Sequence, residues 1–261
     1  MKVKVKSASS DLFRNPKEYE KILFIVNESW GVVDEKIQND IISSAVKNTE
    51  IVEYNKIAFN GFTINAEFRE LCKNNVKHFN LKEQKSGFDN CLPKIYQKNG
   101  YETIAMHGST SYMYDRKYWY PRVGFRKLIF KDTLINKKSK CFSFPGMCDR
   151  DLLTYILQSF KENEKVFFYW LTLNTHMNYD MRDLKVDIFN CEFYNIGSNS
   201  PSCRNLKLQK QFFYYLSKLL ERPEMKGVYI VVVGDHSPPM HGSEKSVFIK
   251  GQVPVLIMRV V

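Results

Sequence analysis

Side chains that can bind a metal ion or move a proton follow four separate apolar segments of the chain. They are Glu28, His107, His176 and the pair Asp235 and His236. In open α/β sheets, sites are assembled outside the carboxyl ends of the strands. For Glu28 or His107 alone, a polar residue after a strand is more simply explained as part of a turn. Four such placements together favour a common site.

Carboxylate oxygens of Glu28 and Asp235 and an imidazole nitrogen of His236 would make a three-ligand set for one divalent cation with an open position. These ligand types do not identify whether the bound ion is zinc or manganese. Thr63 could enter the open position, because a threonine hydroxyl needs a metal or a base to act as a nucleophile. We expect Thr63 at the N-cap of a helix over 64–74, where backbone N–H groups favour phosphate. The alternative interpretation is that Thr63 only caps this helix.

The elements that must position these residues alternate along the chain. Apolar and β-branched runs predict strands at 21–26, 50–54, 101–106, 166–173, 228–233 and 253–260. Apolar spacing and capping residues predict helices at 33–48, 64–74, 149–161 and 206–220. We expect Asp149 to cap the third helix, 253–260 to close an edge of the sheet, and the aromatic-rich segment 112–125 to be irregular. This alternation predicts an α/β fold with a mostly parallel central sheet sandwiched between helices.

Length and charge limit the class of protein. The 261 residues are enough for one sizeable α/β domain, and we expect a single domain over 1–261. The net charge of +11 indicates an anionic partner, such as a phospholipid surface or a phosphorylated glycan. Nucleic acid is not expected, because no helix-turn-helix, zinc-finger or RNP1-like motif accompanies the charge. Apolar runs are too short for a membrane span, and 1–10 lack a signal-peptide core. The chain is expected to be soluble, or the ectodomain of a longer, anchored protein.

The six cysteines allow three sequential pairs. These are Cys72 with Cys91, Cys141 with Cys148, and Cys191 with Cys203. The sequential pairing is one of several possible pairings, and none of the pairs has the spacing of a zinc ribbon or a thioredoxin-like centre. An even count favours an oxidising compartment such as a bacterial periplasm. The alternative is buried free thiols in a cytosolic protein.

Three segments of the chain resemble the signature of lipoteichoic acid synthases and the related phosphoethanolamine and phosphoglycerol transferases. They are Glu28-Ser29, the Gly-x-Thr-x-x-x-Glu-Phe segment at 61–68, and Gly234-Asp235-His236. These families belong to the alkaline phosphatase and sulfatase superfamily, and the resemblance covers 22–255. It implies an alkaline phosphatase-like fold and a sulfatase-like catalytic domain. The chain lacks the Cys/Ser-x-Pro-x-Arg motif, so the formylglycine mechanism of sulfatases is not expected.

The resemblance implies a metal site formed by Glu28, Thr63, Asp235 and His236. Thr63 would be the catalytic residue that carries the phospho-alcohol. His176 would be the second catalytic residue, protonating the leaving alkoxide or deprotonating the incoming alcohol. A second metal ion is also compatible with the family.

A further set of residues is similar to the family segment that holds the donor headgroup. It consists of His107, Ser109, Tyr114 and Arg116. Arg116 would clamp phosphate oxygens through its planar guanidinium; the alternative is a surface cation. His241 would bind substrate or a second metal, or it is an ordinary loop histidine.

The predicted activity is transfer of phosphoethanolamine or phosphoglycerol from a membrane phospholipid to an anionic surface glycan or lipid, through Thr63. The cysteines resemble the phosphoethanolamine branch and 61–68 the phosphoglycerol branch, so the donor stays open. The expected location is the periplasmic or extracytoplasmic face of a bacterial membrane. One alternative is a phosphodiesterase or phosphatase that uses the same site. Another is a non-catalytic module that binds an anionic glycan or nucleic acid through its basic surface.

Overall fold

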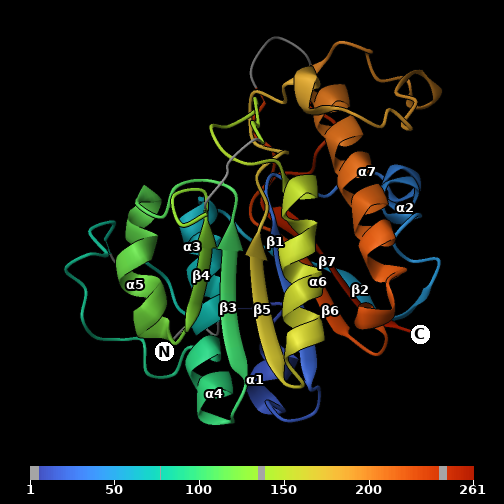
Figure 1. Ribbon diagram of the computed structural model, residues 1–261. Coiled ribbons are helices and arrows are strands. Elements are labelled where there is room, and N and C mark those ends of the chain that lie inside the picture. The colour runs from blue at the N-terminus through green and yellow to red at the C-terminus, as the bar shows by residue number, and fades with distance from the viewer. Residues whose placement is uncertain (1–5, 77, 135–138, 241–245) are drawn as a thin grey trace.

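The computed structural model describes residues 6–76, 78–134, 139–240 and 246–261, in which a seven-stranded sheet lies between two layers of helices (Figure 1). The strands are β1 Lys21–Asn27, β2 Thr49–Ala58, β3 Glu102–His107, β4 Lys127–Phe130, β5 Val166–Leu171, β6 Tyr229–Gly234 and β7 Gln252–Val260. Their order in the sheet is β2-β7-β6-β1-β5-β3-β4. From β6 to β4 all neighbouring strands are parallel, whereas β7 is antiparallel to β6 and β2. The predicted fold class is confirmed.

The helices cover both faces of the sheet. They are α1 Ser10–Arg14, α2 Glu35–Ile42, α3 Thr63–Cys72, α4 Leu92–Lys98, α5 Arg116–Val123, α6 Leu153–Glu162 and α7 Pro201–Leu220. The helices α2, α6 and α7 share one apolar core, and α1, α3, α4 and α5 share the other. Successive side chains of a strand point to opposite faces, so Trp170 of β5 joins the first core and Tyr169 the second. None of the helices within the described ranges is long and apolar enough to cross a bilayer.

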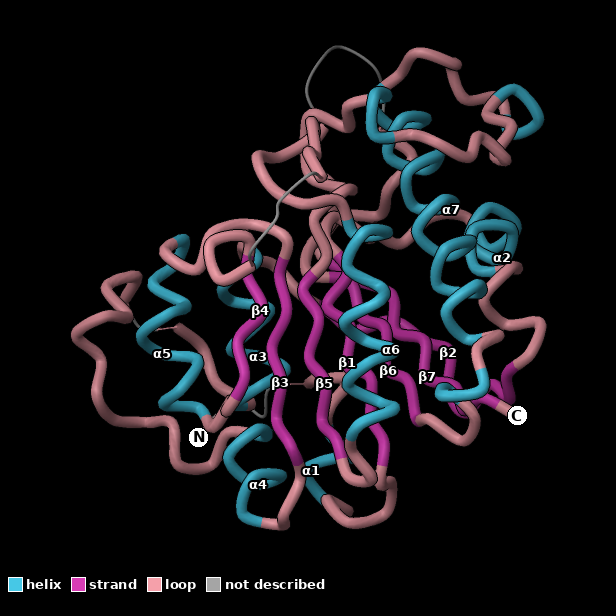
Figure 2. The backbone as a smooth tube through the Cα atoms, in the orientation of Figure 1, coloured by secondary structure: helices cyan, strands magenta, loops and turns pink. Residues whose placement is uncertain are grey.

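Parallel pairing places the carboxyl ends of β1, β3, β5 and β6 at one edge of the sheet. The loops that follow these strands gather there, at the top of the view in Figure 2. The central strands β1, β5 and β6 are buried along nearly their whole length, because helices cover both of their faces. The core therefore holds the strand ends rigidly, and the loops beyond them are free to carry polar side chains.

The prediction of an irregular segment at 112–125 is wrong. After a 3-10 turn at Met113–Asp115, α5 runs through Pro121 without ending. Trp119 and Tyr120 are fully buried, and this packing outweighs the local cost of proline in a helix. Tertiary contacts thus decided this element against its local signals.

Two further predictions about single elements are wrong. The segment 253–260 does not close an edge, because β7 lies between β6 and β2, and its side chains are almost all buried. Asp149 does not cap α6, which begins at Leu153 after a 3-10 turn. Its buried carboxylate instead accepts backbone N–H bonds from Leu173 at 3.0 Å and Asn174 at 2.7 Å. Asp149 therefore secures the loop that follows β5.

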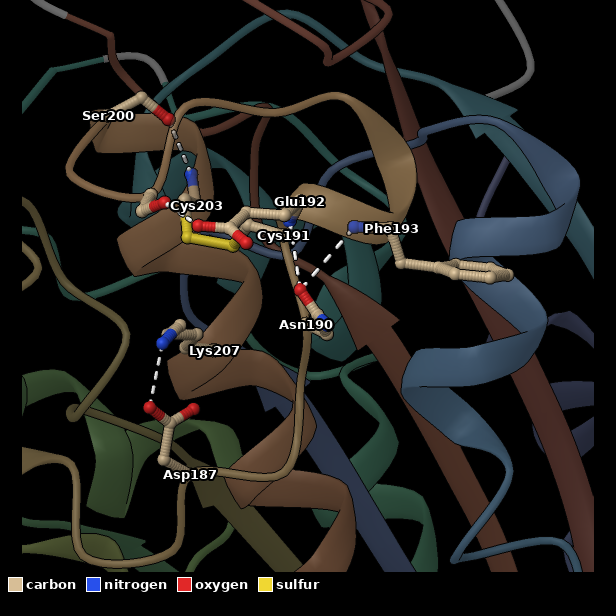
Figure 3. The surroundings of a disulfide bond; sticks show 9 residues. Asp187, Asn190, Cys191, Glu192, Phe193, Ser200, Cys203 and Lys207 are labelled. Atoms are coloured by element: carbon tan, nitrogen blue, oxygen red, sulfur yellow. Dashed lines mark hydrogen bonds and ion pairs between the residues drawn. A yellow bond between two sulfur atoms is a disulfide. The ribbon is translucent and has the colours of Figure 1, made fainter.

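Two of the three sequential cysteine pairs are disulfides. Cys72–Cys91 joins the end of α3 to the start of α4, and Cys191–Cys203 ties a long loop to α7 (Figure 3). The predicted third pair is wrong, because Cys141 and Cys148 are buried free thiols. The Cys141 thiol donates to Oδ2 of Asp183 at 3.2 Å, so a carboxylate satisfies it without a disulfide.

Candidate active site

The predicted metal-site residues meet at the carboxyl edge of the sheet. Glu28 follows β1, and Asp235 and His236 follow β6, the parallel neighbour of β1. Thr63 is the first residue of α3. Its Oγ1 donates to Oδ2 of Asp235 at 2.9 Å and lies 3.4 Å from Oε2 of Glu28 and 3.5 Å from Nε2 of His236. One hydroxyl therefore faces two carboxylates and an imidazole.

Thr63 does not occupy the N-cap position that the sequence analysis assigned to it. The N-cap residue is Phe62, and its backbone N–H is bound by Oδ1 of Asn65 at 3.0 Å. The alternative that Thr63 only caps its helix is therefore wrong. Because Asn65 satisfies the start of α3, the Thr63 hydroxyl is available to the carboxylate cluster.

Backbone groups orient the Asp235 carboxylate. Oδ1 accepts N–H bonds from Ser29 at 2.7 Å and His236 at 2.6 Å, which leaves Oδ2 toward Thr63. Ser29 has a positive φ of 50° and also donates its hydroxyl to Oε1 of Glu28 at 2.9 Å. Gly234 lies so close to this turn that an added Cβ would approach the carbonyl oxygen of Trp30 to 2.1 Å. The turn after β1 and the end of β6 thus pack together without space for a side chain.

Burial and like charge dominate the electrostatics of the cluster. Burial, and then the neighbouring Glu28 carboxylate, raise the pKa of Asp235 to about 7. Burial disfavours the His236 imidazolium, but the Asp235 and Glu28 carboxylates outweigh it and raise the pKa of His236. The Ser237 carbonyl oxygen lies 3.1 Å from Nδ1 of His236 and can only accept. In the neutral ring Nδ1 therefore carries the proton, and the Nε2 lone pair faces the carboxylates.

The donor set fits a divalent cation. One ligand atom each from Glu28, Asp235 and His236 lies within 4.8 Å of the others. Two buried carboxylates at this separation repel each other, as the raised pKa of Asp235 indicates, and a cation between them would relieve that repulsion. Two carboxylates, an imidazole and the Thr63 hydroxyl suit zinc or manganese equally.

His107 is the last residue of β3, and Ser109 follows two residues later, at the same edge of the sheet. Burial, and then the Arg116 cation, lower the pKa of His107 to about 3, so the ring is neutral. Its Nδ1 is 3.0 Å from the carbonyl oxygen of Leu171, which leaves Nε2 as an acceptor. The Ser109 hydroxyl donates to the carbonyl oxygen of Pro145 at 3.3 Å. Both side chains are almost fully buried.

Arg116 is a buried residue, so the alternative of a surface cation is wrong. Its Nη2 and Nε donate to the buried carboxylate of Glu67 at 2.8 Å and 3.2 Å. The guanidinium also lies 5.2 Å from the ring centroid of Tyr114. Burial raises the pKa of Tyr114; the Arg116 cation lowers it, and the Glu67 carboxylate raises it. The structure thus gives Arg116 a carboxylate partner in the position where a phosphate was predicted.

His176 lies in the loop after β5. Burial lowers its pKa, whereas the hydrogen bond to the Met177 carbonyl oxygen and the Asp235 carboxylate raise it. Its Nδ1 faces the carbonyl oxygen of Met177, which leaves Nε2 as an acceptor, and its ring lies 4.5 Å from that of Phe144. The remaining predicted substrate residue, His241, lies outside the described residues.

Polar residues of α7, which were not predicted from the sequence, support the turn after β1. Nε2 of Gln209 donates to the carbonyl oxygens of Glu28 and Ser29, both at 3.0 Å. Nδ2 of Asn205 donates to the Ser29 carbonyl oxygen at 3.1 Å. The available signal was a pair of amides four residues apart on the apolar face of a helix, where polar side chains need buried partners.

The fold and the site together define an α/β protein in which two carboxylates and an imidazole, a set able to hold a divalent cation, face a threonine hydroxyl. Residues 20–257 match the Sulfatase family, and the chain belongs to that family. This confirms the predicted alkaline phosphatase and sulfatase superfamily. No curated protein matches the chain by sequence.

Solved structures with the same fold include three bacterial proteins. The lipoteichoic acid synthase LtaP of Listeria monocytogenes is 14% identical, with 98% of this chain and 71% of that chain covered and a TM-score of 0.68. The phosphoglycerol transferase GacH of Streptococcus pyogenes, in complex with sn-glycerol-1-phosphate, is 16% identical over 97% of this chain and 72% of that chain, with a TM-score of 0.65. The periplasmic domain of EptC from Escherichia coli is 14% identical over 94% of this chain and 73% of that chain, with a TM-score of 0.56. A zinc complex of the EptC domain has also been solved.

Proposed function

We propose that the chain is an enzyme that transfers phosphoethanolamine or phosphoglycerol from a membrane phospholipid to a hydroxyl of an anionic surface glycan or lipid. Thr63 carries the phospho-alcohol between the two. The observation that carries the proposal is the Thr63 hydroxyl, which donates at 2.9 Å to a carboxylate of a three-ligand metal set. The names of LtaP and GacH, which share the fold, support this reaction class.

Glu28, Asp235 and His236 would hold one zinc or manganese ion. When bound, such an ion supplies positive charge that stabilises the threonine alkoxide and the oxygens of a phosphate. The Thr63 hydroxyl and this charge are the two features that a covalent transfer needs.

The reaction proceeds in two displacements at phosphorus. In the first, a bond forms between Oγ1 of Thr63 and phosphorus, and the bond from phosphorus to the diacylglycerol oxygen breaks. Oδ2 of Asp235 accepts the threonine proton along the existing hydrogen bond, and that proton leaves with diacylglycerol.

In the second displacement the acceptor hydroxyl attacks phosphorus and releases Thr63. Nε2 of His176 takes the proton of the acceptor, because a neutral ring with a lowered pKa has this nitrogen available. The proton then returns to Oγ1 of Thr63. Atoms and charges balance over the two steps.

The proposed location is the extracytoplasmic face of a bacterial membrane, with the domain anchored there as part of a longer protein. The two disulfides are of the kind that forms in oxidising compartments. The net charge of +11 favours a surface rich in anionic lipid or glycan. The EptC domain, which shares the fold, is described as periplasmic, and this supports the same compartment.

A peptide mass map tests the proposal and names the donor. Metal-loaded protein is incubated with phosphatidylethanolamine vesicles and, separately, with phosphatidylglycerol vesicles. A headgroup-phosphate adduct on Thr63 with one lipid is the expected result. Thr63→Ser should keep the adduct, whereas Thr63→Ala should lose it. Transfer by Thr63→Ala at the wild-type rate would overturn the proposal, and release of headgroup without any acceptor would establish the hydrolase instead.

A further inference from the structure

A cavity of about 640 Å³ lies next to the loop that carries Ser109, because Pro145, one of its lining residues, accepts the Ser109 hydroxyl. It is larger than the cavity of about 180 Å³ beside His236 and Phe62. Its walls come from the residue after β4, from the hairpin closed by the pairing of Cys141 with Gly146, and from the 3-10 turn after Asp180. Segments that are far apart in the sequence thus form one hollow.

The side chains that line this cavity are cationic. Lys131, Lys140 and Arg182 line it, and the described residues of its lining include neither aspartate nor glutamate. Arg182 pairs with Asp180, but within the described ranges no carboxylate lies in ion-pair range of the Lys131 or Lys140 ammonium. Two unneutralised ammonium groups beside a guanidinium favour an anionic oxygen ligand.

The cavity is preformed. The Phe142 ring lies 4.2 Å from the Arg182 guanidinium and 5.2 Å from the Lys140 ammonium, and it holds both cations at the rim. The buried Asp183 carboxylate fixes the floor, because it accepts the backbone N–H of Phe142 at 2.9 Å and of Ser143 at 2.7 Å. A ligand would therefore bind without ordering this hairpin first.

The same hairpin connects the cavity to the active site. The Pro145 carbonyl oxygen accepts the Ser109 hydroxyl at 3.3 Å. The hairpin packs so closely on Gly108 that a Cβ at Gly146 would lie 2.7 Å from the Gly108 carbonyl oxygen. Phe144, on this hairpin, contacts the His176 ring at 4.5 Å. The hairpin that lines the cavity thus also contacts the proposed base of the second displacement.

We infer that the cavity lined by Lys131, Lys140 and Arg182 binds a phosphate group of the acceptor and so directs the acceptor hydroxyl toward His176. The role of the bound molecule as acceptor rests on the proposed function. The phosphate site itself can be tested separately. The two ammonium groups act as point charges for the phosphate oxygens, and the Arg182 guanidinium, whose Nε and Nη2 donate to Asp180, adds positive charge beside them.

Calorimetry with glucose 6-phosphate tests the site without any catalytic step. The test variant is Lys131→Gln/Lys140→Gln in the metal-loaded protein. The matched control is Lys98→Gln/Lys161→Gln, which removes the same charge at exposed positions at the ends of α4 and α6. We expect the test variant to lose roughly tenfold in affinity and the control to keep wild-type affinity. Equal affinity of all three proteins, or an equal loss in both variants, would overturn the inference.

Two further arms identify the source of the phosphate. Vesicles of phosphatidylcholine with and without phosphatidylglycerol replace glucose 6-phosphate in one arm. If the test variant loses affinity only for the vesicles that contain phosphatidylglycerol, the phosphate belongs to a lipid headgroup. In the other arm, Thr63 is first loaded with headgroup, and its discharge is compared between glucose and glucose 6-phosphate. Faster discharge by glucose 6-phosphate in the wild type, but not in the test variant, supports the acceptor role, and equal discharge contradicts it. If Thr63 never loads, the proposed function fails while the calorimetry still decides the phosphate site.

Discussion

At the scale of single residues, the orientation of Asp235 explains why one threonine hydroxyl becomes available for chemistry. Backbone N–H groups occupy one carboxylate oxygen, so the other is left for Thr63 and for a cation. Two amides of α7 hold the neighbouring turn at Ser29. The site therefore depends on backbone geometry as much as on the ligands.

Replacement of Asp235 by Asn should weaken zinc binding by on the order of 100-fold or more, because even residues that only orient metal ligands change affinity by about 10–100-fold. Metal content after dialysis against buffered zinc, measured by mass spectrometry, checks this. Asp187→Asn is the matched control, since Asp187 is an exposed carboxylate that pairs with Lys207 of α7 (Figure 3). Stoichiometric zinc in Asp235→Asn at the same free zinc concentration would refute the assigned ligand.

At the scale of elements, a buried ion pair joins α3, the helix of the proposed nucleophile Thr63, to α5. Glu67 lies one turn after Thr63 on α3, and Arg116 is the first residue of α5. Both side chains are buried, and the Tyr120 hydroxyl also donates to Glu67. This pair sets the position of α3, and through it the position of Thr63.

Glu67→Gln should destabilise the fold by about 3–5 kcal/mol, because it leaves the Arg116 cation buried without a counter-charge. Urea unfolding followed by circular dichroism measures the change. The control Glu221→Gln breaks an exposed pair with Lys218 and should cost less than about 1 kcal/mol. The double variant Glu67→Gln/Arg116→Gln should recover part of the loss. A Glu67→Gln protein as stable as the control would mean that Arg116 has another anionic partner.

At the scale of the whole molecule, the two disulfides lie outside the sheet and secure its surroundings. One links α3 to α4 on one face, and the other ties the loop after β5 to α7 on the opposite face. Of the remaining two cysteines, Cys141 lines the cavity with Lys131, Lys140 and Arg182, and both Cys141 and Cys148 donate hydrogen bonds to Asp183. Covalent links thus reinforce the periphery while polar contacts organise the hairpin near the site.

Alkylation with iodoacetamide under denaturing but non-reducing conditions should modify Cys141 and Cys148 and leave the other four cysteines unmodified. The reason is that only these two are free thiols. Peptide mass mapping before and after reduction checks the assignment. Adducts on Cys72 or Cys203 without reduction would contradict the pairing.

The sequence by itself determined the fold class, the superfamily and the identity of the residues that meet at the site. Continuous apolar runs predicted the buried parallel strands, and residues placed just after them had to share one edge of the sheet. This reasoning brought Glu28, Asp235 and His236 together, as the structure does, because strand direction and strand ends are local properties of the chain. Thr63 was expected there from a helix start and from the family resemblance.

Only the tertiary structure decided which partner each polar group binds. Arg116 pairs with Glu67, Asp149 accepts from the loop after β5, and Asn65 takes over the helix start that was assigned to Thr63. The place of β7 inside the sheet and the helix at 116–123 were also decided by packing. The physical reason is that these outcomes depend on contacts between residues distant in sequence, whose burial energy exceeds the local preferences that a sequence displays.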